Sequence, residues 1–387
     1  MVSQYNLTAE QQTIQNVARQ FAAEKLLSRY MQGDTHESVI DRELLKEIGE
    51  LGLIGPELPE DLGGLGLSCI TTGLIIEALA HGDFNVASVL VSASLTGQII
   101  AANARHDVAL DWVPRMINGE ALVAIALTEP RGGSDAASLV LSATRCDGGY
   151  RMNGEKTSIT FAGQADAVVT FARTGEPGSR AGGVSAFLLP TDSRGITTTR
   201  FRDLGNRVVG RGSYFFDDVF VPEEYLLGEE GKGFGQVMHG FDYSRALLGL
   251  LCLGTAQASL DDSWAYVNER EAFGKTLSEF QGVTFPLAEF ETRVAAAREL
   301  CYHALRLKDE GKPHTSEAAM CKWLGPVTAR DTIHQCLLTF GHYGWSEDLP
   351  HQQRLRDVMA MEIGDGTAQI MKMIIARQQA VHARERA

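Results

Sequence analysis

One loop of the sequence combines residue types that can hold a polar ligand. An apolar run from Ala121 to Leu127 leads into Thr128-Glu-Pro-Arg-Gly-Gly-Ser-Asp135, which contains a proline, two adjacent glycines and two hydroxyl side chains. Glycines allow tight turns, and the N–H groups and hydroxyls of such a turn can bind a polar ring edge or a pyrophosphate. Taken alone, an ordinary turn after a strand is the better interpretation. The elements around the loop must decide between these two interpretations.

The pattern of apolar residues divides the chain into three parts. The periodicity is helical up to about residue 119, where short alternating runs separated by Gly and Asp turns begin and predict a small antiparallel sheet or barrel. After Pro222 the helical pattern returns, and four long segments joined by short loops predict a bundle. Those segments are 241–269, 277–308, 315–339 and one from about 367. We predict a mainly helical α+β protein with an N-terminal helical domain (1–119), a central antiparallel β-barrel domain (120–226) and a C-terminal four-helix bundle (227–387).

Within the N-terminal part, three local signals are clear. Thr8-Ala9-Glu10-Gln11 predicts a capping box at the start of a helix, and a second helix is expected from Asp41 to Leu53. The run from Val86 to Ala102 is interrupted by serine, threonine and glutamine, so we expect it to be too polar for a membrane span and to be a buried helix.

Composition narrows the classes of function. The 387 residues are 44% hydrophobic and 22% charged, as in a folded globular protein, and the net charge is −14. Such an acidic chain is not expected to bind nucleic acid or an anionic membrane, and it needs local arginine or lysine to bind a polyanion.

The cysteines and the N-terminal residues indicate the cellular compartment in which the protein is expected. Six cysteines are scattered singly with no Cys-x-x-Cys pair, so we predict reduced thiols and no structural metal site. The start MVSQYNLTAEQQ lacks a basic-then-apolar signal pattern, and a cytoplasmic protein is expected.

Several motifs in register resemble one enzyme family. Ala126-Leu-Thr-Glu-Pro-Arg-Gly-Gly-Ser-Asp135 is similar to the signature of the acyl-CoA dehydrogenases. Other matching stretches are Leu51–Glu57, Asp61–Gly66, Phe216–Pro222, Leu227-Gly228, Gly231–Phe234, Arg270–Lys275 with Gln281, Phe340-Gly341, Arg356-Asp357 and Asp365–Gln369. They occur in the family's order over nearly the whole chain, which makes the resemblance specific.

The resemblance implies an FAD cofactor bound between the β-domain and the bundle. The residues implied at the flavin and its phosphates are Leu127, Thr128, Gly133 and Ser134. Ser158, Ile159 and Thr160 would flank the isoalloxazine ring. The residues implied elsewhere along the cofactor are Arg270, Phe273 and Gln281, partly from a neighbouring subunit, with Phe340, Gly341, Thr367 and Gln369.

Arg270 has both a functional and a structural interpretation. Its planar guanidinium suits a phosphate group, which an acidic chain must bind through such local donors. The alternative is a surface ion pair with Glu269 or Glu271.

The resemblance also implies the reaction and its base. Family members remove an α-proton with a carboxylate while the β-hydrogen leaves as hydride to the flavin, and the base is usually a glutamate before Gly-Thr. Here Asp365 holds that position, while Ser244 stands where some relatives carry their base instead. An N-cap before Gly366-Thr367 is the alternative role of Asp365, and Glu362 is a weaker candidate for the base.

Three departures from the family pattern suggest a wide acyl pocket. The Asp365 side chain is one methylene shorter than glutamate, and Gly364 and Ser158 replace residues that are commonly bulky or aromatic. These changes suit a cyclic or α-branched acyl group, as in the relatives that act on alicyclic thioesters such as cyclohexanecarboxyl-CoA. The residues expected to line the substrate site are Ser134, Asp242, Arg245, Gly364 and Gly366.

Other functions remain as alternatives. A nitroalkane oxidase also uses an aspartate base but needs no CoA, and Asp242 with Arg245 weighs against it. An acyl-CoA oxidase would usually be longer, and a dehydrogenase of carrier-protein thioesters would need a basic docking patch. A non-catalytic scaffold would be expected to lose Arg270, the Thr-Glu-Pro loop and the base, and all three are present.

The resemblance implies two kinds of partner. A dehydrogenase passes its electrons on, in this family commonly to an electron-transferring flavoprotein. A cofactor shared across an interface implies a homotetramer, by analogy with the fold.

Overall fold

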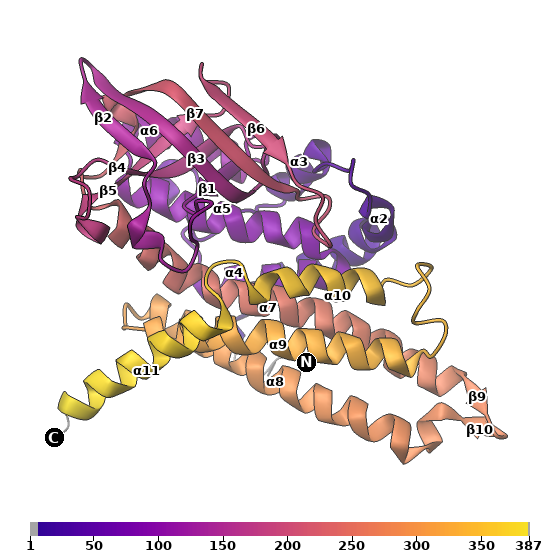
Figure 1. The fold of residues 1–387 in the computed structure, drawn as a ribbon. Coiled ribbons are helices and arrows are strands. Elements are labelled where there is room, and N and C mark those ends of the chain that lie inside the picture. The colour runs from indigo at the N-terminus through magenta and orange to yellow at the C-terminus, as the bar shows by residue number, and fades with distance from the viewer. Residues whose placement is uncertain (1–6, 386–387) are drawn as a thin grey trace.

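The N-terminal part is built from six helices, as the apolar periodicity indicates. The computed structural model describes residues 7–385 (Figure 1). These helices are α1 (Ala9–Phe21), α2 (Leu27–Tyr30), α3 (Arg42–Glu50), α4 (Cys69–Gly82), α5 (Phe84–Asn103) and α6 (His106–Ile117). The predicted capping box begins α1, where the Thr8 hydroxyl accepts from the Gln11 N–H and the Gln11 side chain accepts from the Thr8 N–H, each at 3.1 Å.

Helix α5 is more apolar than its interrupted sequence suggested. Its mean hydropathy reaches 1.5, so it is long and apolar enough to cross a membrane, and the expectation that this run is too polar is wrong. Two of its hydroxyls bond back to their own helix: Ser88 donates to the Asn85 carbonyl at 2.7 Å and Thr96 to the Ser92 carbonyl at 2.8 Å. The expected burial is found, because 72% of that window is buried against the rest of the protein. One such helix is weak evidence for a membrane span, because buried core helices have the same composition.

The central part forms one mixed sheet. Its strands are β1 (Val123–Ala126), β2 (Ser142–Cys146), β3 (Gly149–Thr160), β4 (Ala167–Arg173), β5 (Val184–Pro190), β6 (Ile196–Arg200), β7 (Arg211–Pro222) and β8 (Leu226–Leu227). They pair in the order β6-β7-β3-β2-β4-β5-β8, with β1 beside β4. Most pairs are antiparallel, as predicted, but β1 and β2 run parallel to β4. The strand order of the described residues is a path from β6 to β8 with β1 added beside β4, an order that alternation along single strands cannot reveal.

The C-terminal part is organised around one long helix. Helix α7 (Gly233–Glu269) packs against α8 (Gln281–Asp309) and α9 (Thr315–Thr339), and a short hairpin, β9 (Glu271–Ala272) and β10 (Lys275–Thr276), joins α7 to α8. The unpredicted α10 (His351–Met359) lies on α9, and α11 (Ala368–Glu385) contacts α9 before extending away from the body (Figure 1). With 37 residues, α7 is about 55 Å long at 1.5 Å per residue.

A buried carboxylate joins all three parts. Asp357 on α10 accepts hydrogen bonds from the Tyr30 hydroxyl at 2.7 Å and the Asn85 amide at 3.2 Å, both in the N-terminal part. It also accepts from the backbone N–H of Asn206, in the loop between β6 and β7, at 2.6 Å. The contact fixes the start of the segment that leads through a short 3₁₀ turn, Ala360–Glu362, to Asp365.

Candidate active site

A buried ion pair organises the loop after β1. Lys156 on β3 is fully buried, and its ammonium lies 2.9 Å from the Glu129 carboxylate and 3.0 Å from the Leu127 carbonyl. Glu129 also accepts from the backbone N–H groups of Val140 and Leu141, at 2.7 and 2.8 Å. Burial lowers the pKa of Lys156 to about 8, and Glu129 opposes that shift. The pair therefore clamps the Thr-Glu-Pro loop to the strand that carries Ser158, Ile159 and Thr160.

Beside this loop, β3 is bulged where the sequence predicts a flavin contact. The pairing of β3 with β7 shifts between Lys156 and Ile159, and Ser158 has a left-handed backbone with φ of 61°. The Thr157 N–H donates to the Thr128 carbonyl at 2.9 Å, so the bulge and the loop lie side by side. Arg211 donates to the Ser158 hydroxyl at 3.2 Å and pairs with Asp203 at 2.7 Å.

The groups at this edge fit a cofactor with a polar ring and phosphates. Among the described residues, the hydroxyls of Thr128, Ser134 and Thr160 have no hydrogen-bond partner, and Ser134 is exposed. A side chain added at Gly132 would meet nothing within 4 Å, and one at Gly133 only Thr128 at 3.5 Å. Free hydroxyls beside open glycine backbone are suited to bind FAD through its ring edge and phosphates.

Asp365 lies in a strained turn between α10 and α11. Its φ is 53° and that of Gly366 is 101°, both in the left-handed region that side chains avoid. A Cβ at Gly366 would lie 2.6 Å from the terminal methyl of the Met371 side chain, which is flexible, but the φ of 101° would strain any other residue there. Among the described residues the Asp365 carboxylate accepts no hydrogen bond, whereas the Thr367 hydroxyl accepts from the Ile370 N–H at 3.4 Å. The N-cap at this helix start is therefore Thr367, and the Asp365 carboxylate is left free.

Two buried cations approach this turn. Arg245 on α7 pairs with Asp242 at 3.1 Å, and Lys322 on α9 donates to the Gly366 carbonyl. Loss of water around the half-buried Asp365 raises its pKa, and the charges of Lys322 and Arg245 partly offset that rise. A raised pKa makes a carboxylate a stronger proton acceptor, as a general base requires.

The neighbours of Asp365 separate the candidates for the base. Arg330 donates to both oxygens of Glu362 at 2.9 and 2.7 Å, so that carboxylate is held away from a catalytic role. Ser244 is fully buried on α7, and its hydroxyl has no partner among the described atoms. A Cβ at Gly364 would meet only the Ala360 carbonyl, at 3.7 Å, so the space beside the base is open.

A second group of predicted cofactor residues lies far from this turn. Arg270 follows the last residue of α7, 25 residues beyond Arg245, which places it about 38 Å along the helix axis. Arg270 and Gln281 are exposed, and Phe273 is 96% exposed with φ of 53°. Arg270 forms no ion pair within residues 7–385, so the predicted alternative of a pair with Glu269 or Glu271 is not found.

Phe340 and Gly341, at the end of α9, differ in environment. The Phe340 ring stacks on Tyr266 with centroids 4.2 Å apart and is largely buried. Gly341 is exposed with φ of 60°. Because α7 separates the two ends of the bundle, one chain does not bring Arg270, Phe273 and Gln281 to the loop that carries Thr128.

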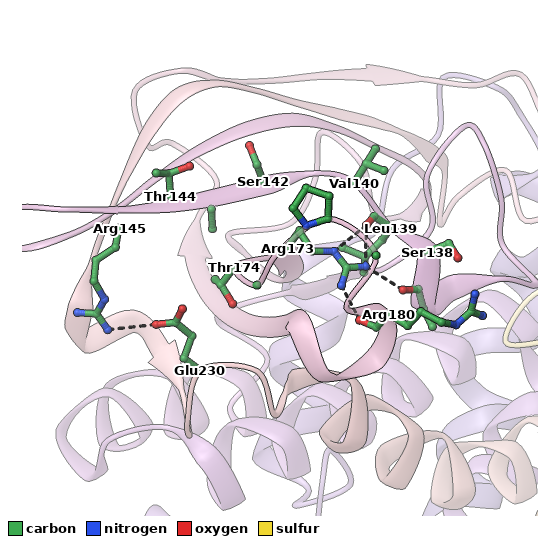
Figure 2. A pocket seen from close by; sticks show the side chains of 15 residues that line it. Ser138, Leu139, Val140, Ser142, Thr144, Arg145, Arg173, Thr174, Arg180 and Glu230 are labelled. Atoms are coloured by element: carbon green, nitrogen blue, oxygen red, sulfur yellow. Dashed lines mark hydrogen bonds and ion pairs between the residues drawn. The ribbon is translucent and has the colours of Figure 1, made fainter.

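A large cavity begins just beyond the Gly-Gly-Ser-Asp loop. It measures about 650 Å³ and lies between residues 137–145, 173–180 and Glu230 (Figure 2). Three arginines and one glutamate line it. Arg145 pairs with Glu223 and Glu230, whereas Arg173 donates to carbonyl and hydroxyl oxygens and forms no ion pair within residues 7–385. Arg180 pairs with Asp135 at 3.0 Å, which connects the cavity to the residue after Ser134.

Three segments that together span most of the chain match the domains of one enzyme. Residues 8–120 match the N-terminal domain of acyl-CoA dehydrogenase, 124–219 its middle domain and 231–380 its C-terminal domain. The chain belongs to the acyl-CoA dehydrogenase family.

Relatives and solved structures agree over nearly full lengths. The chain is 34% identical to benzylmalonyl-CoA dehydrogenase of Aromatoleum aromaticum over 377 residues, which cover 97% of this chain and 99% of that protein. It matches a chain from structural work on the electron transferring flavoprotein of Acidaminococcus fermentans with TM-score 0.93 and 32% identity, covering 97% and 99% of the two chains. PigA, solved with FAD and proline, matches with TM-score 0.93 and 26% identity, covering 98% and 99%.

Membership of the family settles the class of reaction. The protein is an FAD-dependent acyl-CoA dehydrogenase, an oxidoreductase that acts on acyl-CoA thioesters. The predictions of the fold class, the enzyme class and the FAD cofactor are confirmed.

Four residues around the site were not predicted from the sequence. They are Glu129, Lys156, Arg211 and Lys322. Lys156 did leave a signal, because it takes the same inward side of β3 as Tyr150 and Met152, where a lysine needs a buried partner. Glu129 lies in the Thr-Glu-Pro motif, but that motif does not indicate its partner. Arg211 and Lys322 carry no signal, since their partners are distant in the sequence or are backbone groups.

The ion pair under the loop can be tested by removing its acid. Glu129→Ala leaves the Lys156 ammonium buried without a partner, which is expected to cost roughly 3–5 kcal/mol of unfolding free energy. We expect lower stability in urea and a lower FAD content after purification. Glu176→Ala, which removes an exposed carboxylate from a surface loop, serves as the matched control. Equal stability and FAD content in the two variants would contradict the role given to this pair.

Proposed function

We propose that this enzyme dehydrogenates a cyclic or α-branched acyl-CoA, such as cyclohexanecarboxyl- or cyclohexenecarboxyl-CoA, with Asp365 as the base. The observation that carries the proposal is the free Asp365 carboxylate beside an open Gly364. An unbonded carboxylate has its lone pairs available for a proton. The missing side chain at Gly364, the shorter Asp365 and the small Ser158 leave room for a ring or a branch.

The backbone of the same turn supports proton removal. An α-proton next to a thioester is barely acidic, so the carbonyl oxygen needs donors as negative charge develops on it. The N–H groups of Asp365 and Gly366 have no partner among the described residues. We propose that the Asp365 N–H donates to the thioester oxygen while its carboxylate takes the α-proton. Asp242 and Arg245 on α7, with Ser134, would face the bound thioester.

FAD accepts the β-hydrogen as hydride when it is bound. Leu127, Thr128, Gly133 and Ser134 would hold it from the loop, and Ser158, Ile159 and Thr160 from the bulged strand, with Thr367 and Gln369 close by. The junction at Asp357 supports this arrangement. Arg211 bonds Ser158 and pairs with Asp203. Three residues further along the chain, the N–H of Asn206 donates to Asp357 on α10, and Asp357 lies eight residues before Asp365.

The cavity beyond Ser134 favours a CoA thioester over a carrier-protein thioester. A concave site of about 650 Å³ suits a compact nucleotide group, whereas a protein carrier needs an exposed basic surface. Arg173, which has no carboxylate partner among the described residues, provides a positive charge at this cavity for the phosphates of CoA. The paired Asp242 and Arg245 also weigh against a nitroalkane oxidase, which has no CoA chain to bind.

The exposed hairpin supports a subunit-shared cofactor. Arg270 lies about 38 Å from Arg245 along α7, and the exposed Phe273 and Gln281 follow it in the chain. We propose that these three residues complete the FAD site of a neighbouring subunit in a homotetramer. Phe340 and Gly341 would belong to that end of the cofactor. We propose an electron-transferring flavoprotein as the electron acceptor and a cytoplasmic location, the latter on six free cysteines.

The proposed substrate class can be tested by anaerobic mixing of the yellow enzyme with thioesters while the flavin absorbance is followed. We expect rapid bleaching by cyclohexanecarboxyl-, cyclohexenecarboxyl- or isobutyryl-CoA and slow bleaching by butyryl- and octanoyl-CoA. Loss of flavin absorbance with nitroethane but with none of the thioesters would contradict the proposal and indicate a nitroalkane oxidase.

The wide pocket makes a separate prediction at Gly364. Gly364→Tyr fills the open space, so it should slow the ring-containing thioesters at least tenfold more than butyryl-CoA, since misplacement by about 1 Å costs roughly a hundredfold in rate. The same panel of thioesters measures this selectivity. Equal losses for ring and straight-chain substrates would show that Gly364 does not set the width of the pocket.

The base is tested by Asp365→Asn. This variant should retain FAD and thioester binding and lose flavin reduction by about a thousandfold or more, because general-base catalysis typically contributes 10²–10⁴-fold. Glu362→Gln is the matched control and should retain reduction, since Glu362 is held by Arg330. Turnover retained in Asp365→Asn and lost in Glu362→Gln would move the base to Glu362.

A further inference from the structure

Lys322 is a buried cation without an acidic partner in contact. It is 1% exposed on α9, and within residues 7–385 it forms no ion pair. Its ammonium has one hydrogen-bond acceptor, the backbone carbonyl of Gly366. Burying an unpaired charge is costly, so a lysine in this place calls for an explanation beyond packing. Asp365, the proposed base, is the residue directly before Gly366.

The hydrogen bond falls on the strained part of the turn. Asp365 and Gly366 are consecutive residues with left-handed backbone, at φ of 53° and 101°, and such conformations persist only when the surroundings impose them. Lys322 is separated from Gly366 by 44 residues in the sequence and reaches it from a different helix. By holding the Gly366 carbonyl, Lys322 restrains the direction in which the adjoining Asp365 side chain points.

Of the two cations that act on Asp365, Lys322 has the larger effect and Arg245 the smaller. Arg245 on α7 is already paired with Asp242, and Glu362 in the 3₁₀ turn is held by Arg330. The Cys252 thiol on α7 also acts on Lys322, and burial keeps that thiol neutral by raising its pKa. Asp365 and Lys322 are then the two unpaired charges, of opposite sign, at this point of the fold.

We propose that Lys322 is a positioning residue for the base: it fixes the Asp365–Gly366 turn and favours the ionised form of Asp365. This inference rests on the proposed role of Asp365. An opposite charge within a few ångströms lowers the pKa of a carboxyl by about 1–3 units. Burial lowers the pKa of Lys322 itself to about 8, with Asp365 opposing the shift, so the lysine is charged below that pH. Its electrostatic effect on the base is therefore present at and below neutral pH.

Two substitutions separate the charge of Lys322 from its hydrogen bond. The base works only when ionised, so flavin reduction is lost as pH falls through the pKa of Asp365. Removal of the ammonium raises that pKa, and the acidic limb of the rate against pH should move up by about one unit in both Lys322→Gln and Lys322→Met. Lys322→Gln keeps a donor for the Gly366 carbonyl, so its rate should approach that of the wild type above pH 8. Lys322→Met lacks the donor and should stay about tenfold slower there.

The controls distinguish this inference from its foundation. Lys372→Met removes an exposed lysine that lies over Trp323, the residue after Lys322, and should leave the pH profile unchanged. Asp365→Asn is measured alongside: if it retains flavin reduction, the proposed base fails, whatever Lys322 does. If Asp365→Asn abolishes reduction and both Lys322 variants keep the wild-type acidic limb, the inference alone is overturned. Lower thermal stability without a shift of the acidic limb would likewise show that Lys322 has only a structural role. If Lys322→Met does not fold, Lys322→Gln alone serves as the test.

Discussion

The buried carboxylate of Asp357 is the contact on which the arrangement of the three parts depends. It is 1% exposed, and its oxygens accept from Tyr30 and Asn85 of the N-terminal helices and from Asn206 of the sheet. Burial raises its pKa to about 6, while the Asn206 N–H and the Tyr30 hydroxyl oppose that rise. A buried group with several donors from different elements tolerates little displacement, because each lost bond leaves a polar atom unsatisfied. The junction thereby fixes α10 against the sheet, and through α10 the turn that carries Asp365.

Buried lysines then hold the two halves of the site. Lys156 clamps the loop after β1 through Glu129, and Lys322 holds the turn before α11 through the Gly366 carbonyl. Both lie in apolar surroundings that lower their pKa to about 8. The two lysines differ in their partners: Lys156 has a carboxylate in contact, whereas the part of the chain that the structure describes offers Lys322 only a carbonyl. Stabilisation of the loop and control of the base are thus achieved by the same kind of side chain in different electrostatic settings.

The length of α7 determines how far apart the predicted ligand contacts of one chain lie, and this distance is the basis for the assembly that we propose. Asp242 and Arg245 lie near its start, and Arg270 follows its end, so a single chain separates these predicted ligand contacts by most of the helix. The exposed Phe273 would be an unfavourable surface residue in an isolated chain. A second subunit would both cover that ring and bring Arg270 to a cofactor, which one rigid helix cannot do alone.

The sequence by itself determined the order of the elements, the family and the residue types at the base, because these depend on local patterns and on motifs in register. The capping box at Thr8, the helix at 315–339 and the position of Asp365 before Gly-Thr are of this kind. Only the tertiary structure decided that β1 and β2 run parallel to β4, that Thr367 rather than Asp365 caps α11, and that Lys322 reaches Gly366. Tyr30 and Asp357 are separated by 327 residues, and no local pattern encodes such a contact. Pairing between distant polar groups is fixed by packing, since a buried charge or hydroxyl takes whichever partner the fold brings within reach.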